Sequence, residues 1–210
     1  MKTKSILFSL LFAAISFALL INCSGSKKED ATTETHESHS DEAAAPAEEK
    51  KVADASAPQF EVDPKFQEQL GNVFESYVSL KEAFVSSNAE KVKAEANSAS
   101  QSVASVDMKL LTGAAHNDWM TFLTPIQNSL KEMQSSSDIE EQRKSFSTLS
   151  DNLYKSIKAF GLGGKDAFYE YCPMAFNNEG AYWLSDQEKI RNPYFGDKML
   201  TCGEVKEKLQ

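Results

Sequence analysis

The 210-residue chain is short of positive charge: it has 22 Lys and Arg against 31 Asp and Glu, a net charge of −9. Proteins that bind nucleic acid carry clustered positive charge that neutralises phosphates, so the composition argues against a nucleic-acid partner. The sequence also has no Ser-His-Asp arrangement, no glycine-rich phosphate loop and no convincing pair of inward-facing carboxylates. We therefore expect a binding or structural protein and not an enzyme.

Cysteines and long apolar runs are also scarce. Residues 6–21 form one apolar run, preceded by Lys2 and Lys4, which is typical of a secretion signal and too short for a confident membrane span. The run ends in Leu20-Ile21-Asn22-Cys23, which looks like a bacterial lipoprotein processing site. This pattern predicts a signal peptide over residues 1–23, with a lipid on Cys23. An ordinary signal peptide cut near Ser24, or an uncleaved anchor, is the alternative.

Residues 24–58 lack aromatic side chains and are rich in acidic residues, Ala, Ser, Thr and Pro. Such a segment cannot bury enough apolar surface to fold, so it is predicted to be a disordered acidic tether. Its two histidines, His36 and His39, make a poor metal site without a fixed backbone. The remaining residues, 59–210, are long enough to form one domain with its own core.

Four segments of this domain carry apolar residues at alternating steps of three and four, the spacing of one helix face. The first helix is predicted to start at Asp63-Pro64, and the second to start at Asn88 and stop at Gly113. In the third, Pro125 is predicted to be a kink or the true start. The fourth is predicted to start at Ser137-Asp138-Ile139-Glu140 and to stop at Gly161. Short links between them favour antiparallel neighbours. The predicted fold is all-α: an up-and-down four-helix bundle.

The C-terminal tail, residues 165–210, is interrupted by Pro and Gly and is the most aromatic part of the chain. It is predicted to be irregular but ordered, packed on the bundle, because those rings need burial. A helical turn or two is expected over residues 166–171, and another helix start at residues 185–188. No strand-like alternation of any length is apparent.

Two cysteines in this tail each have a methionine nearby: Cys172 with Met174, and Met199 with Cys202. Thiolate and thioether sulfur form a soft ligand set that selects Cu(I), so these four residues are a candidate copper site. His116, at the opening of the third helix, is a further candidate ligand. The alternative is that Cys172 and Cys202 form a disulfide, which an extracytoplasmic compartment permits, while the methionines fill gaps between aromatic rings.

The tail motifs resemble those of the DUF3347 family. They are Tyr171-Cys172-Pro173-Met174-Ala175, Gly180-Ala181-Tyr182-Trp183-Leu184-Ser185, Ile190-Arg191-Asn192-Pro193-Tyr194-Phe195-Gly196 and Met199-Leu200-Thr201-Cys202-Gly203. The resemblance extends upstream through His116-x-x-Trp119-Met120 and Arg143-x-x-Phe146-x-x-Leu149-Ser150, over roughly residues 66–206.

That domain also occurs appended to periplasmic adaptor subunits of copper/silver efflux pumps. The resemblance therefore implies a helical bundle that handles copper or silver outside the cytoplasm, with a heavy-metal efflux component as a possible partner. The lipoyl and β-barrel regions of those adaptors are not recognisable in this sequence, which leaves metal binding or delivery as the implied role.

Two functions are thus expected. The first is a lipid-anchored cell-envelope protein, on the periplasmic or surface face, that buffers or delivers Cu(I) or Ag(I). The second is a structural or interaction lipoprotein without a metal, locked by a Cys172–Cys202 disulfide.

Overall fold

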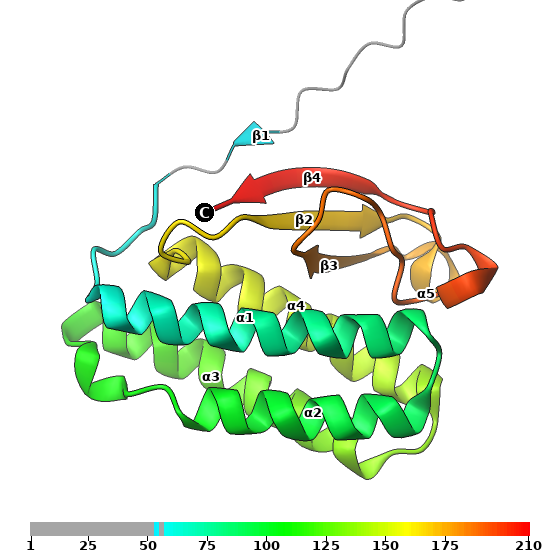
Figure 1. Ribbon diagram of the computed structural model, residues 1–210, viewed down its shortest axis with the longest axis horizontal. Coiled ribbons are helices and arrows are strands. Elements are labelled where there is room, and N and C mark those ends of the chain that lie inside the picture. The colour runs from blue at the N-terminus through cyan, green and yellow to red at the C-terminus, as the bar shows by residue number, and fades with distance from the viewer. Residues whose placement is uncertain (1–52, 55–56) are drawn as a thin grey trace, which may run out of the picture. The chain divides into compact units, whose positions relative to one another are not determined.

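The computed structural model describes residues 53–54 and 57–210. The predicted signal peptide, Cys23 and most of the acidic tether lie outside the described residues. Four long helices, each packed against the next in an up-and-down arrangement, dominate the domain (Figure 1). They are α1 (Pro64–Val85), α2 (Ala89–Ala104), α3 (Gly113–Ser135) and α4 (Ile139–Phe160). No helix in the described part of the chain is both long and apolar enough to cross a membrane.

The predicted helix starts are confirmed by side-chain caps. The carboxylate of Asp63 accepts a hydrogen bond from the Lys65 N–H at 2.8 Å, and Asn88 caps α2 through the Lys91 N–H at 2.9 Å. Asp138 accepts from the Glu140 N–H at 2.8 Å at the start of α4. Each cap supplies a partner to a backbone donor that the first helical turn leaves unpaired.

The second and third helices differ from their predicted bounds. α2 ends at Ala104, and a separate 3₁₀ helix η1 (Met108–Leu110) follows it. Gly113 is the first residue of α3, where its φ of +58° suits glycine, and not the stop of the preceding helix. α3 also continues through Pro125, which neither starts it nor ends it. The apolar pattern of the sequence did not reveal the break after Ala104, because Val106 and Leu110 still pack on the core after the helix has ended.

The tail forms a small antiparallel sheet, so the fold is mostly helical but not all-α. Its strands are β2 (Ala167–Cys172), β3 (Ala181–Ser185) and β4 (Glu204–Leu209), in the order β4-β2-β3. A two-residue strand, β1 (Ala53–Asp54), pairs in parallel with β4. The predictions of helical turns over 166–171 and a helix start at 185–188 were wrong. Strands of five or six residues with aromatic side chains on both faces show little alternation, so the sequence pattern did not reveal them.

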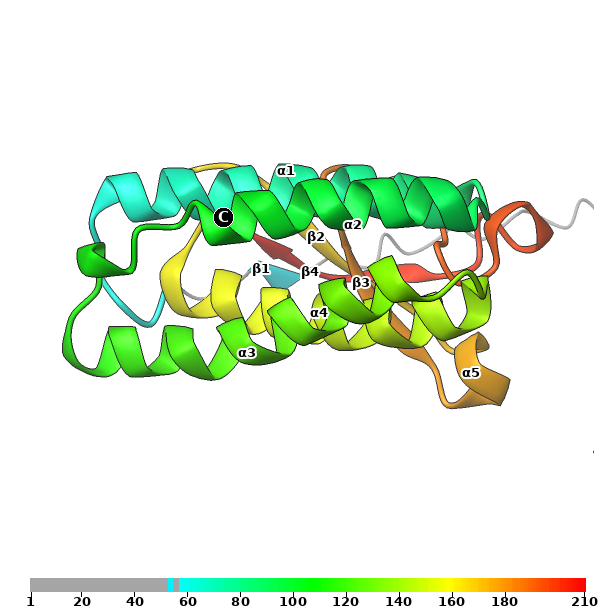
Figure 2. The ribbon, with the colours of Figure 1, turned by 90° about the horizontal axis from the view of Figure 1, so that it is seen from below.

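The sheet is attached through β3, which lies between α1 and α4 (Figures 1 and 2). The Tyr77 hydroxyl of α1 accepts the backbone N–H of Leu184 at 3.0 Å and is also hydrogen-bonded to Ser150 of α4 at 2.7 Å. Trp183, the neighbour of Leu184, is fully buried. One tyrosine hydroxyl therefore joins α1, α4 and β3 inside the core.

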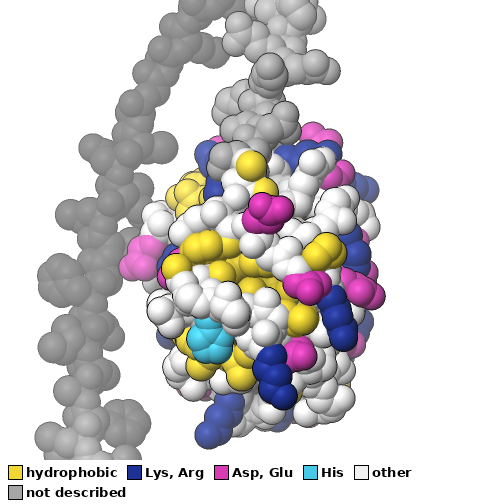
Figure 3. Space-filling model, turned by 90° about the vertical axis from the view of Figure 1, so that its left-hand side faces the viewer, with side chains coloured by type: hydrophobic (Ala, Val, Ile, Leu, Met, Phe, Trp, Pro, Cys, Tyr) yellow, Lys and Arg dark blue, Asp and Glu magenta, His cyan; other side chains and the backbone are white. Residues whose placement is uncertain are grey.

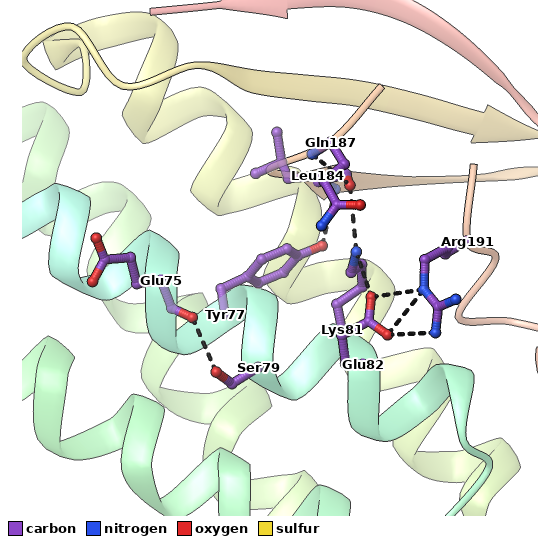
Figure 4. A network of polar contacts seen from close by, with 9 residues as sticks. Glu75, Tyr77, Ser79, Lys81, Glu82, Leu184, Gln187 and Arg191 are labelled. Carbon is purple, nitrogen blue, oxygen red and sulfur yellow. Dashed lines mark hydrogen bonds and ion pairs between the residues drawn. The ribbon is translucent and has the colours of Figure 1, made fainter. Parts of the chain in front are cut away.

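A charged cluster continues this attachment along α1 (Figure 4). Lys81 is only 1% exposed; its ammonium group donates to Ser185 Oγ at 3.3 Å and pairs with Glu82 at 2.8 Å. Arg191, in the segment after β3, donates through Nε and Nη2 to the same Glu82 carboxylate. The two cations lower the pKa of Glu82 against the opposing effect of burial. Glu82 therefore holds α1 to the segment that leads toward Cys202.

Glu170 of β2 is the unusual polar residue in this region. Its side chain is fully buried, pairs across strands with Trp183, and neither carboxylate oxygen has a hydrogen-bond partner among the described residues. Burial raises the pKa of Glu170 to about 8, although the nearby Lys81 ammonium lowers it. A buried carboxyl without partners is far less costly when neutral, so Glu170 is protonated in the folded protein at neutral pH.

This raised pKa predicts a pH dependence of stability. Between about pH 5 and pH 8 the unfolded chain has lost the Glu170 proton while the folded protein retains it. The free energy of unfolding therefore falls as pH rises through this window. The isosteric change Glu170→Gln removes the titration, so the variant should gain stability relative to wild type as pH rises from 5 to 8. Urea unfolding at both pH values measures this difference.

The exposed Glu188→Gln serves as the control, and a Glu170→Gln difference that is equal at both pH values would contradict the assignment.

Candidate thiol and soft-metal site

The structure brings the two tail cysteines into contact. Cys172 is the last residue of β2 and Cys202 precedes β4 by two residues. Because these strands pair antiparallel, with Tyr171 opposite Glu204, the end of one lies beside the start of the other. The two Sγ atoms are 2.7 Å apart, and both cysteines are free thiols. Cys172 is fully buried, whereas Cys202 is half-buried, so the pair can be reached from the Cys202 side.

Asn192 organises the loop that carries Cys202. It is fully buried, and both its backbone and its side-chain polar groups are paired. Its side-chain N–H donates to the Cys202 carbonyl at 2.7 Å, and its Oδ1 accepts the Tyr194 N–H at 2.8 Å. Its backbone N–H donates to the Leu200 carbonyl at 2.8 Å, while its carbonyl accepts the Gly196 N–H at 3.1 Å. One asparagine thus closes the 192–202 loop and sets the position of the Cys202 backbone.

The loop after Cys172 has an uncommon backbone. It contains the short element α5 (Ala175–Asn178), in which Phe176, Asn177 and Asn178 all have positive φ, between 50° and 71°. Non-glycine residues pay roughly 1–2 kcal/mol each for this left-handed conformation. Three in succession make this a strained turn, of the kind that is found at functional sites.

The two candidate methionines lie in the loops that adjoin the cysteines. Met174, two residues after Cys172, is 46% exposed. Met199 follows the 3₁₀ helix η2 (Gly196–Lys198), is half-buried, and accepts the Cys202 N–H through its carbonyl at 3.1 Å. Both thioethers are therefore in the segments that hold the thiols.

His116 does not join this group. It lies in the first turn of α3, at the end of the bundle opposite the α5 loop and the end of β2 (Figures 1 and 2). The sequence could not reveal this because the direction of β2 decides which end of the bundle the cysteines reach. The structure therefore excludes His116 as a ligand of a site at Cys172 and Cys202.

Aromatic side chains enclose the buried side of the thiol pair. A Cβ on Gly203 would come within 2.8 Å of the Trp183 ring and 3.0 Å of the Tyr171 carbonyl, so the chain beside Cys202 lies directly on these groups. Tyr194 packs edge-on against both Trp183 and Phe176, with ring centroids 5.9 and 5.3 Å apart. Glycine at position 203 therefore allows the close approach on which the pair depends.

The environment keeps the Cys202 thiol protonated. Burial and, to a lesser extent, the adjacent Cys172 raise the pKa of the Cys202 thiol to about 11. Thiolate, not thiol, is the nucleophile and the metal ligand, so Cys202 is a poor nucleophile at neutral pH and loses its proton when a metal binds. Among the described residues no three His, Cys, Asp or Glu side chains converge into a metal-holding group. A metal at this pair would draw further donors from the methionine sulfurs.

Comparison with known proteins identifies the helical part of the domain. Residues 73–165 match the family described as "Protein of unknown function (DUF3347)". This match supports the resemblance to the DUF3347 family. The match is shorter than the predicted 66–206: it runs from α1 to the start of the tail, and the cysteine motifs follow the matched DUF3347 region. Neither a curated protein nor a solved structure matches the chain.

Sequence reasoning missed the residues that position the thiols. Asn192 precedes Pro193, a common turn signal, but that signal does not indicate that its side chain reaches the Cys202 carbonyl. Arg143 pairs with Glu140 at 2.5 Å and donates to the Pro193 carbonyl at 3.0 Å, and Arg191 pairs with Glu82. Both arginines thus fasten the 191–193 segment to the helices.

Asn192→Asp tests whether this residue positions the thiols. The change keeps the acceptor for Tyr194 but places a carboxylate oxygen against the Cys202 carbonyl, so we expect a loss of about 1–3 kcal/mol in stability. We also expect slower disulfide formation under mild oxidant, because Cys202 is no longer held beside Cys172. Thiol counting against time measures the second effect.

Asn152→Asp is the matched control for this variant. It removes a similar side-chain hydrogen bond, to the Thr148 carbonyl at 2.8 Å, within α4 and away from the cysteines. It should leave the oxidation rate unchanged. Wild-type oxidation kinetics in Asn192→Asp, alongside reduced stability, would show that Asn192 supports the fold but does not position the pair.

Proposed function

We propose that this protein is a lipid-anchored component of the bacterial cell envelope, on its periplasmic or surface face, that binds Cu(I) or Ag(I) and buffers it or delivers it to a partner. The observation that carries the proposal is the contact between Cys172 and Cys202, with their Sγ atoms 2.7 Å apart. Thiolate and thioether sulfur prefer soft monovalent ions, and Met174 and Met199 lie in the loops that carry the two cysteines.

Metal binding requires a modest opening of the pair. A thiolate-bound metal such as zinc lies about 2.3 Å from each sulfur, which places two sulfurs of a tetrahedral site roughly 3.8 Å apart. The Sγ atoms, at 2.7 Å, therefore have to separate by about 1 Å or more. Cys202 is the half-buried member and lies in a loop, so its side chain is the one that can turn without disturbing a strand.

The same distance favours a second candidate function. A disulfide bond is about 2.05 Å long, so the two sulfurs are closer to a bonded pair than to two ligands of one ion. A bond between residues 172 and 202 would close a loop of roughly 30 residues and stabilise the fold by about 3–4 kcal/mol in the chain-entropy model. In that case the protein is a structural or interaction lipoprotein whose tail is locked covalently.

A Cu(I) titration separates these two functions. Reduced protein, titrated against a colorimetric Cu(I) chelator, should bind about one Cu(I), and the bound ion should protect both thiols from alkylation. Oxidised protein should bind far more weakly, because the disulfide uses the same sulfurs. The double change Met174→Leu and Met199→Leu keeps side-chain volume and removes the donor sulfurs, so affinity should fall while the fold survives.

Met133→Leu is the control for that double variant, because Met133 is fully buried in the core of α3 and has no part in the proposed site. It should bind Cu(I) as wild type does. Reduced wild-type protein that binds no Cu(I) would refute the copper proposal. If the double variant binds Cu(I) with wild-type affinity, the two methionines serve only in packing, and the structural disulfide is the favoured function.

The membrane anchor is a separate part of the proposal and rests on the signal pattern that ends at Cys23. We expect the Cys23→Ala protein to lose labelling by radioactive palmitate and to leave the membrane fraction. The Cys172→Ala protein, which keeps the processing site, should remain labelled and membrane-bound. A wild-type protein that is freely soluble in cell extracts would refute the anchor.

A further inference from the structure

The exposed apolar side chains of the described residues share one property. Large hydrophobic side chains are exposed at three positions, and all three are methionines: Met108 at 39%, Met120 at 39% and Met174 at 46%. Methionine is the residue of this class that carries a donor sulfur. Met174 adjoins the thiol pair at one end of the bundle. Met120 lies in the second turn of α3, at the other end, four residues after His116.

We propose that His116 and Met120 form a second soft-metal site, separate from the cysteine pair. Residues four apart on a helix lie on one face with their Cβ atoms about 5–6 Å apart, and helical side chains lean toward the N-terminus. The thioether of Met120 therefore reaches back toward the imidazole of His116. Imidazole and thioether together suit Cu(I) or Ag(I).

Trp119 fixes the orientation of this pair. It is fully buried, packed edge-on against Phe66 and Phe160 with ring centroids 5.4 and 6.2 Å away, so its side of α3 faces the core. At about 100° per residue, His116 and Met120 both lie to the same side of Trp119, roughly 60° and 100° from the core direction. This agrees with a half-buried histidine and an exposed methionine at the edge of the helix.

The surroundings suit a soft monovalent cation. A pocket of about 290 Å³ opens at the N-terminal end of α3, with apolar walls that include Phe60, Leu111 and Ala115, the neighbour of His116; His116 and Met120 themselves are not among its lining residues. Two acidic residues, Glu61 and Asp63, also line it. Figure 3 shows the histidine next to apolar surface on this face, with acidic and basic side chains in the same region. Apolar walls weaken competition from water, and the carboxylates favour positive charge.

Silver ion is the probe for this site, because Ag(I) is soft and does not change oxidation state in air. The full chain carrying Cys172→Ala, Cys202→Ala, His36→Gln and His39→Gln removes the thiol pair and the tether histidines. It should still bind one Ag(I) by titration calorimetry, and the ring protons of His116 should shift in the NMR spectrum. Adding Met120→Leu or His116→Gln should weaken binding by roughly tenfold or more, since one donor of a chelating pair is lost.

Met108→Leu in the same background is the matched control: it removes an equally exposed thioether, 39% like that of Met120, that is not paired with a histidine four residues away, and binding should not change. The proposal is overturned if Met120→Leu binds as tightly as its parent, or if Met108→Leu weakens binding as much. If the fourfold variant does not fold, the titration is repeated on the wild-type chain. Two equivalents of Ag(I) should then shift the His116 ring signals, which are identified as the signals that disappear in His116→Gln. In the fourfold variant the Cys172–Cys202 pair is absent, so its result is independent of Cu(I) binding at that pair.

Discussion

The insertion of β3 between α1 and α4 is the constraint on which the rest of the structure depends. The Tyr77 hydroxyl accepts the Leu184 N–H, and the buried Lys81 ammonium donates to Ser185, so two polar groups of α1 hold two successive residues of the strand. Trp183 fills the core between them. With β3 fixed, its partner β2 is fixed, and the antiparallel pairing of β2 with β4 then brings Cys172 to Cys202. The contact between the thiols is a consequence of strand register far from the sulfurs.

The surroundings of the thiol pair have opposing effects on its reactivity. Burial disfavours the thiolate, the hydrogen bonds of Asn192 hold the Cys202 backbone near Cys172, and the left-handed turn after Cys172 stores strain beside it. Cys202, as a neutral thiol, is a poor nucleophile although its sulfur lies in contact with that of Cys172. A metal and a disulfide would use the same sulfurs, so each excludes the other, and the redox poise of the compartment decides which is formed.

Local signals in the sequence predicted the helices well, because a cap or an apolar stripe is decided within a few residues. Asp63 and Asn88 cap where the sequence indicated, while α4 is capped by Asp138, one residue after the Ser137 of the predicted capping box. The end of α2 at Ala104 was missed because Val106 remains in the core after the helix stops. The sheet was missed because strand pairing depends on partners dozens of residues away. For the same reason the sequence grouped His116 with the cysteines, whereas the direction of β2 separates them by the length of the bundle.

The position of β3 also dictates an order of assembly. The α1–α2 and α3–α4 hairpins join neighbours in the chain and can form as soon as each has been synthesised, since local contacts have a small loop-closure cost. The side of the bundle between α1 and α4 is completed by β3, which follows all four long helices in the sequence. Until that strand is in place, Tyr77, Lys81 and the apolar faces around them stay open to solvent, and the two cysteines are still apart. The chemistry of the thiol pair is therefore available only after β3 has packed against the helices.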